Sequence, residues 1–300
     1  SHDLVRAMLA YDVVGFQTAQ DRRNFVAFCI QELGGEELDN DRVRVSGRTV
    51  RASAFPIGID AEGFAEFALS PEAVEHEDMV RDIAHGRHQI VGVDRLDYSK
   101  GIIERLRGFE QLLEDYPENR GASQFLQVAP LSRAELDAYA ELRVEVEQLA
   151  GNINGRFATL DWTPVQIMTR GFTRRALAGI YRAARVCMVT PLRDGMNLVA
   201  KEYVAAQNSD DPGVLVLSRF AGAREELGQA LIVNPYSSED VARAMQRALT
   251  MSLSERKERH DALRRTVFGN TAGHWCAAFL SALEDDRPEV AAQGNPVIKG

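Results

Sequence analysis

Short apolar runs rich in β-branched residues alternate along this chain with longer segments of helical periodicity. Several of these runs are apolar at every position, which is typical of parallel strands that are covered on both faces. Regular alternation of strands and helices implies crossover connections and an α/β fold with a doubly wound parallel sheet. The predicted strands are 13–16, 89–93, 125–128, 156–159, 186–189, 214–217 and 231–233, and the predicted helices between the later strands are 103–116, 133–149, 174–184, 198–207 and 239–251.

The beginning of the chain departs from this regular pattern. A helix is expected over 3–9 and another over 19–33, with the strand 13–16 between them. A hairpin follows at 43–50, where the pair Ser46-Gly47 suits a tight turn. Pro56 and Gly58 then interrupt the pattern, so we place a domain boundary near residue 57.

The end of the chain also loses its periodicity. Beyond Asp285 it carries Pro288, Gly294, Pro296 and Gly300, a composition that predicts a disordered tail. A helix over 271–283 precedes that tail. The expected organisation is therefore 1–56, a main domain over 57–268, a separate helix within 269–284, and the tail 285–300.

Composition narrows the class of protein. A hydrophobic fraction of 45% and a charged fraction of 26% are typical of a globular chain. The net charge of −9 disfavours broad attachment to nucleic acid or to anionic membrane. No apolar run reaches the length of a membrane span, and no basic and apolar leader opens the chain. Cys29, Cys187 and Cys276 lie far apart among apolar residues, so we expect three buried thiols and a cytoplasmic protein.

The first candidate site follows the predicted strand 89–93. Arg95 and Lys100 stand on the loop between that strand and the next helix. In open α/β sheets ligands bind outside the carboxyl ends of the strands, where helix N-termini also favour anions. Two cations at this position suit a diphosphate group without a metal. An ordinary loop with Asp94 and Asp97 as salt-bridge partners explains the same residues.

The second candidate site follows the predicted strand 186–189. Gly195 allows close approach of the backbone to a ligand, and Asn197 is suited to cap the helix that begins at Leu198. The first amides of that helix would then be free for a phosphate. Asp194 and Glu202 are placed to line opposite sides of one pocket, and a carboxylate at Glu202 suits the hydroxyl donors of a ribose. Helix capping and a solvated face are the alternative explanation.

A third position of interest is Arg133, which follows the predicted strand 125–128 and has Ser132 as its capping neighbour. Its guanidinium suits bidentate binding of phosphate or carboxylate, although an arginine in this setting is more often a surface residue. The chain has no P-loop, no Gly-x-Gly-x-x-Gly fingerprint and no Gly-x-Ser-x-Gly elbow. The sequence therefore does not indicate a P-loop nucleotide-binding protein, a dinucleotide-binding domain of the Gly-x-Gly-x-x-Gly type or a hydrolase with a Gly-x-Ser-x-Gly elbow.

Four segments together resemble one enzyme family. They are VDRLDYSKG at 93–101, NING at 152–155, TPLRDGMNLVAKEY at 190–203 and LIVNPY at 231–236, and they resemble the trehalose-6-phosphate synthase family over residues 11–283. The resemblance implies a retaining GT-B glycosyltransferase, in which two Rossmann-like domains flank the active site. It also implies transfer of glucose from UDP-glucose to glucose 6-phosphate, with trehalose 6-phosphate and UDP as products.

Carried over position by position, the resemblance implies a donor site. Arg95 and Lys100 would neutralise the diphosphate of UDP-glucose, and Phe172 would lie near the uracil. The start of the helix after Asn197 would present backbone amides to the phosphates, and Glu202 would bind the ribose. The residues of that helix segment are Leu198, Val199, Ala200, Lys201 and Glu202.

The resemblance also implies the reacting groups. Asp194 would contact the transferred glucose near its reacting face, and Arg133 would reach the phosphate of the acceptor. No metal or other cofactor is implied, because cationic side chains and a helix N-terminus would take the charge of the leaving group. Retention would follow from attack on the same face through an oxocarbenium-like transition state.

The chain departs from the family pattern at its beginning. Family members carry a domain-sized block upstream that includes a glycine-rich donor loop and most acceptor contacts. We therefore expect residues 1–56 to be a remnant of the acceptor-side domain, and the chain to be a truncated part of the enzyme. A glucosylglycerol-phosphate synthase and a non-catalytic UDP-sugar-binding module are the alternatives. The oligomeric state is open, and a homo-oligomer is compatible with the sequence.

Overall fold

A computed structural model describes residues 2–130 and 137–285 of the chain. Contacts divide the chain into two compact units. The larger unit comprises residues 57–274, and the smaller unit comprises residues 1–56 together with the chain from Trp275 onward. No described helix is long and apolar enough to cross a membrane.

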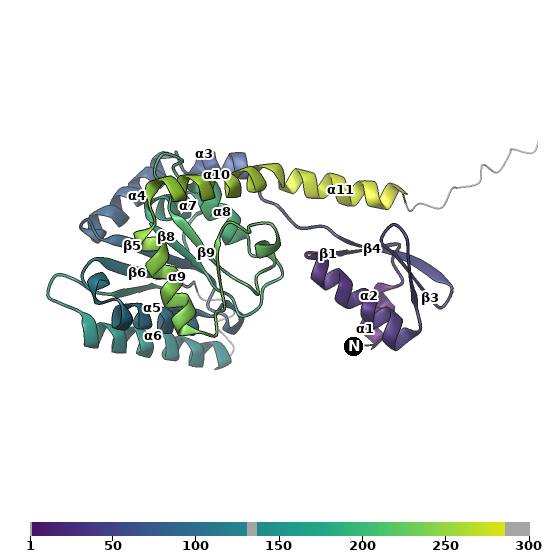
Figure 1. Cartoon of the computed structure of the whole chain (residues 1–300), viewed down its shortest axis with the longest axis horizontal. Coiled ribbons are helices and arrows are strands. Elements are labelled where there is room, and N and C mark those ends of the chain that lie inside the picture. The colour runs from purple at the N-terminus through teal and green to yellow at the C-terminus, as the bar shows by residue number, and fades with distance from the viewer. Residues whose placement is uncertain (1, 131–136, 286–300) are drawn as a thin grey trace, which may run out of the picture. The chain divides into compact units, whose positions relative to one another are not determined.

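The larger unit is built on a six-stranded parallel sheet, which confirms the predicted α/β class (Figure 1). From β5 the chain moves outward through β6 to β7, then returns beside β5 as β8 and continues to β9 and β10. The direction of winding therefore reverses between β5 and β8, and such a reversal is where open α/β sheets bind ligands. In spatial order the strands are β10 (Leu231–Val233), β9 (Val214–Ser218), β8 (Val186–Val189), β5 (His88–Val93), β6 (Ser123–Val128) and β7 (Val165–Met168).

Helices cover both faces of this sheet (Figure 1). Successive strand residues point to opposite faces, so Ile90 joins one buried apolar cluster and Val91 joins the other. The Ile90 face is covered by α5 (Ile102–Asp115), α6 (Asp137–Phe157) and α9 (Ser238–Thr250). The Val91 face is covered by α3 (Ala61–Phe67), α4 (Pro71–Ala84), α7 (Arg174–Ala183), α8 (Leu198–Ala206) and α10 (Leu253–Gly269).

One predicted strand is wrong. Residues 156–159 were expected to be a strand, but α6 continues to Phe157, and the sixth strand is Val165–Met168. Arg156 forms ion pairs with Glu110 and Glu114 of α5, and its guanidinium lies 4.8 Å from the centre of the Phe157 ring. These contacts stabilise a last helical turn that local β-propensity does not predict. The first residues of the predicted helix 133–149 lie outside the described part of the chain.

The smaller unit contains a four-stranded mixed sheet in the order β1-β4-β3-β2. The predicted hairpin is confirmed, with both turn residues at positive φ, Ser46 at 51° and Gly47 at 82°. Phe279 packs near Phe55, and the Trp275 indole donates a hydrogen bond of 3.1 Å to the Phe55 carbonyl. The elements are α1 (His2–Met8), β1 (Val13–Phe16), α2 (Ala19–Leu33), β2 (Glu36–Leu38), β3 (Arg42–Val45), β4 (Arg48–Ala54) and α11 (Ala272–Asp285).

The cysteines only partly match the expectation of buried thiols. Cys29 and Cys187 are buried, whereas Cys276 is exposed on α11. All three are free. Burial raises the pKa of the Cys187 thiol well above its ordinary value, so this thiol is kept in its neutral form.

Candidate functional site

The loop after β5 is held in place by its own carboxylate. Asp97 accepts hydrogen bonds from the Ser99 backbone N–H (2.9 Å) and hydroxyl (2.7 Å), and these hydrogen bonds lower its pKa against the opposing effect of burial. The short 3₁₀ turn Tyr98–Lys100 follows, and Gly101 leads into α5. Arg95 is exposed on this loop and Lys100 is largely covered.

Gly101 brings this loop into close contact with the end of the neighbouring strand β8. Its φ is +64°, and an added Cβ would lie 2.5 Å from the carbonyl oxygen of Thr190 at the end of β8. Leu192 also donates a backbone hydrogen bond of 2.8 Å to the Ser99 carbonyl. The loops after β5 and β8 are therefore packed backbone against backbone, which requires a residue without a side chain at Gly101.

The loop after β8 is fixed on its other side by residues 218–223. The Asp194 N–H donates to the Phe220 carbonyl at 3.1 Å, and the Gly222 N–H donates to the Asp194 carbonyl at 3.0 Å. Asn197 then caps α8 through the Ala200 N–H, as predicted, with a positive φ of 78°. Positive φ is uncommon for a residue other than glycine, and asparagine is among the residues that adopt it most readily.

The structure brings Lys100 and Asp194 together from sequence positions 94 residues apart. The Lys100 Nζ and the Asp194 Oδ2 are 2.6 Å apart, with 17% and 18% of the two side chains exposed. The Asn197 amide donates to the same Asp194 oxygen at 3.1 Å. A lysine ammonium has three donors, so this ion pair leaves further donors for an anion beside the α8 N-terminus.

A buried arginine beneath these loops was missed in the sequence. The Arg105 side chain on α5 is 0% exposed, and its guanidinium contacts Asp94 at 2.7 Å, Thr190 at 2.9 Å and Gln127 at 3.0 Å. It thereby binds residues at the ends of β5, β6 and β8. Asp94 pairs with this residue, so the salt-bridged loop proposed as an alternative for Arg95 and Lys100 does not use Asp94.

The burial of this pair affects its electrostatics. Burial raises the pKa of Asp94, and the neighbouring Arg105 and Lys100 charges oppose that rise. Gly92 makes room for the guanidinium, because an added Cβ there would lie 2.5 Å from the Arg105 Nη1. The signal in the sequence was an arginine on the apolar side of a helix, beside Ile102 and Leu106, facing strand positions with glycine and glutamine.

Helix α8 presents its residues in two directions. Leu198 is exposed and Val199 is half-buried at the open first turn, and Ala200 is buried. Lys201 is buried, with its Nζ 2.8 Å from the Ile57 carbonyl and 2.6 Å from Glu226. Its side chain thus forms a hydrogen bond and an ion pair within the larger unit.

Glu202 lies one helical turn after Leu198 on α8, and 17% of its side chain is exposed. Its oxygen is 3.6 Å from the Arg174 guanidinium, which in turn lies over the Phe64 ring. Burial raises the pKa of Glu202, and the Arg174 charge opposes that rise. A sheltered carboxylate of this kind is suited to accept hydrogen bonds from neutral hydroxyls.

The remaining predicted site residues are Phe172 and Arg133. Phe172 is half-buried, with the Arg170 guanidinium 4.8 Å from the centre of its ring and the His76 ring edge-on to it. Arg133 lies outside the described residues. In the described part of the chain, no group of three or more histidine, cysteine or acidic residues is arranged to hold a metal ion.

Comparison with known proteins identifies relatives over nearly the whole chain. The sequence profile of Glycosyltransferase family 20 matches residues 1–285. A trehalose-6-phosphate synthase of Sodalis glossinidius is 46% identical over 284 residues, which cover 94% of this chain and 60% of the relative. One from Sinorhizobium fredii is 45% identical over 94% of this chain and 61% of the relative.

Solved structures agree with the sequence relatives. An α,α-trehalose-phosphate synthase (UDP-forming) of Burkholderia xenovorans in complex with glucose-6-phosphate superposes with a TM-score of 0.92 at 46% identity, over 94% of this chain and 63% of that one. An E. coli protein of the same kind, bound with UDP-2-fluoro glucose, has a TM-score of 0.91 at 42% identity, over 94% and 63%. The chain thus spans about three fifths of the length of the relatives that it matches.

Proposed function

The chain belongs to glycosyltransferase family 20, and we propose that it carries the donor-binding part of an α,α-trehalose-phosphate synthase (UDP-forming). The reaction would move glucose from UDP-glucose to glucose 6-phosphate with retention at the anomeric carbon. The trehalose-6-phosphate synthases that the chain matches support this reaction, and one related structure holds glucose-6-phosphate while another holds UDP-2-fluoro glucose.

The donor site rests on one observation above all, the 2.6 Å contact between Lys100 and Asp194 at the winding reversal of the sheet. In this proposal Lys100 and Arg95 bind the diphosphate, while the open first turn of α8 presents the N–H groups of Leu198 and Val199. Three sources of positive potential then converge on one group. Glu202 binds the ribose hydroxyls, and Phe172 lies near the uracil.

The chemical step breaks the bond between the anomeric carbon of glucose and the β-phosphate oxygen of UDP. The acceptor hydroxyl oxygen forms the new bond on the same face, and its proton passes to the departing phosphate oxygen. Negative charge grows on that oxygen as the bond breaks, and Lys100 and Arg95 stabilise it there. Asp194 orients the glucose, and its contact with Lys100 couples sugar binding to phosphate binding.

By the resemblance to the family, Arg133 would bind the acceptor phosphate. We infer a cytoplasmic site of action, because all three cysteines are free and two of them are buried.

Calorimetric titration of UDP and UDP-glucose into the chain tests the donor assignment. We expect binding in the range of about millimolar or tighter, and a loss of about tenfold or more in Arg95→Ala, because a charged hydrogen-bond donor to phosphate is removed. The matched control is Arg243→Ala, an exposed arginine of α9 in an ion pair with Asp240, and this variant should bind as the wild type does. Absence of UDP binding, or equal losses in the two variants, would refute the assignment.

A further inference from the structure

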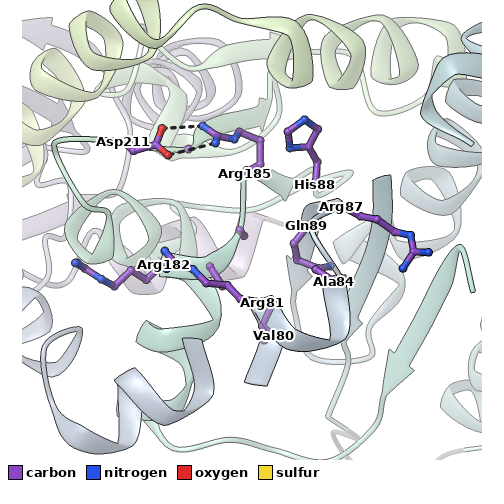
Figure 2. A pocket seen from close by; sticks show the side chains of 13 residues that line it. Val80, Arg81, Ala84, Arg87, His88, Gln89, Arg182, Arg185 and Asp211 are labelled. Atoms are coloured by element: carbon purple, nitrogen blue, oxygen red, sulfur yellow. Dashed lines mark hydrogen bonds and ion pairs between the residues drawn. The ribbon is translucent and has the colours of Figure 1, made fainter. Parts of the chain in front are cut away.

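A cavity lies on the opposite side of the sheet from the loops after β5 and β8, at the amino ends of the strands. Its volume is about 540 Å³, which is within the range of small-molecule sites. Its walls come from the end of α4, the first residues of β5, the end of α7 and the loop before β9 (Figure 2). The proposed donor residues follow the carboxyl ends of these strands, so this cavity is a separate place in the domain.

The lining is strongly basic for a chain of net charge −9. Four arginines and one histidine line the cavity, together with a single carboxylate from Asp211. Figure 2 shows Arg185 reaching toward Asp211, while the Arg87 guanidinium turns away from that pair. Arg87 is used elsewhere, since it contacts Asp161 at 2.9 Å and the Gly121 carbonyl at 3.1 Å.

Two carboxylates, Glu77 and Asp211, are each shared between two guanidiniums. Glu77 is buried and lies 2.6 Å from Arg81 and 3.0 Å from Arg182. Asp211 contacts Arg185 at 3.1 Å and Arg256 at 2.6 Å. Each cluster therefore carries an excess of one positive charge, and both clusters border the same cavity.

Two of the arginines, Arg182 and Arg185, are held by contacts within the larger unit. The Arg185 backbone bonds to Gln89 of β5 and to Val214 of β9, both at 2.8 Å. Arg182 is largely covered, with 19% of its side chain exposed. Preorganised guanidiniums lose less side-chain entropy on binding, which favours a specific site over a loose cationic surface.

The electrostatics of His88 agree with this charge excess. His88 lies at the start of β5, on the cavity wall. Burial lowers its pKa first, and the positive charges of Arg185 and Arg256 lower it further. A bound anion would oppose that second effect and raise the pKa of His88.

We propose that this cavity binds a small phosphorylated anion through Arg81, Arg182 and Arg185. Guanidinium forks match the geometry of phosphoryl oxygens, and two basic clusters on one cavity suit a molecule with more than one anionic group. Nucleic acid is a poor occupant, because the site is concave and the chain as a whole is acidic. The inference does not depend on the proposed transferase activity.

The test is a calorimetric titration of inorganic pyrophosphate into the whole chain. We expect pyrophosphate binding to a site that is still present in Arg95→Ala. The affinity of that site should fall by about tenfold or more in the double variant Arg81→Gln, Arg182→Gln. Arg243→Gln, which alters an exposed arginine remote from the cavity, should leave this affinity unchanged within about twofold. Loss of all pyrophosphate binding in Arg95→Ala, or unchanged binding in the double variant, overturns the proposal.

One further variant and three further anions complete the test. Arg81→Gln alone serves if the double variant does not fold, because 61% of the Arg81 side chain is exposed, and it should still weaken binding by about threefold or more. Inorganic phosphate and glycerol 3-phosphate distinguish the free ion from an ester, and binding of either supports the site. Malonate tests the chemical class, and binding of malonate as tight as that of pyrophosphate would refute a phosphoryl site.

Discussion

Arg105 shows how a residue remote from a ligand can determine the shape of a site. Its guanidinium bonds to Asp94, Thr190 and Gln127, which end three neighbouring strands, and contacts the Lys100 carbonyl at 3.3 Å. A buried ion pair of this kind contributes little net stability compared with an apolar replacement of both partners. Its effect is to position the loop that carries Lys100.

Replacement of Arg105 by methionine is expected to lower the free energy of unfolding by about 3–5 kcal/mol, because Asp94 would remain buried without a partner. Urea unfolding followed by circular dichroism measures this loss. The double variant Arg105→Met, Asp94→Leu should recover much of it. A loss below about 1 kcal/mol in the single variant would show that Asp94 does not depend on this pairing.

Glu202 provides a prediction about pH. Burial raises its pKa in the folded chain, so the folded state favours the protonated form. Its contribution to stability is therefore fully present below the unfolded pKa and is lost as the pH rises through the folded pKa. Glu202→Gln should then stabilise the chain relative to the wild type near pH 7, and the difference should shrink near pH 4.

Urea midpoints of both proteins across that pH range test this sign. Glu239→Gln is the matched control, an exposed glutamate in the first turn of α9, and its midpoint difference from the wild type should not follow the Glu202→Gln pattern. A Glu202→Gln difference that grows toward low pH would contradict the assignment. The same substitution should also weaken UDP binding if Glu202 holds the ribose.

At the scale of elements, the contact between two loops decides the geometry of the site. The loops after β5 and β8 touch through Gly101, whose φ of +64° and closeness to the Thr190 carbonyl exclude a side chain. Both loops were predicted as sites because each followed an apolar strand and preceded a helix. Their direct contact was not predictable, because it depends on the strand order of the sheet.

Gly101→Ala is expected to destabilise the chain by about 1–3 kcal/mol and to weaken UDP binding, since the loop must move away from β8. The control is Gly151→Ala, because Gly151 lies within α6 and an added Cβ there meets nothing within 4 Å. That change should stabilise the chain by about 0.5–1 kcal/mol. Equal effects of the two substitutions on urea unfolding would contradict the steric account.

The elements that could be read from the sequence had strong periodicity or clear caps. The predicted strands 186–189 and 231–233 were found at their predicted bounds, and the helix over 19–33 begins and ends as expected. The strand Val165–Met168 was missed, because a glutamine interrupts its apolar run and only its first residue is buried. Arg105 was missed because its role comes from three strand ends that are distant in the sequence.

At the scale of the larger unit, the two anion sites that we propose lie at opposite ends of the strands of one parallel sheet. The carboxyl edge holds Lys100 and Asp194 beside a helix N-terminus, and the amino edge holds the cavity of Arg182 and Arg185. Strands β5 and β8 run between these edges. The net charge of −9 therefore does not describe the cavity lining, where four arginines accompany one carboxylate.

The central claim is that the loops after β5 and β8 bind the diphosphate of a nucleotide sugar. The most direct measurement compares the calorimetric affinities of UDP and uridine for the chain and for Lys100→Ala. The account predicts that UDP binds the wild type at least about tenfold more tightly than uridine, and that Lys100→Ala removes most of this advantage. Equal affinities of UDP and uridine for the wild type would contradict it.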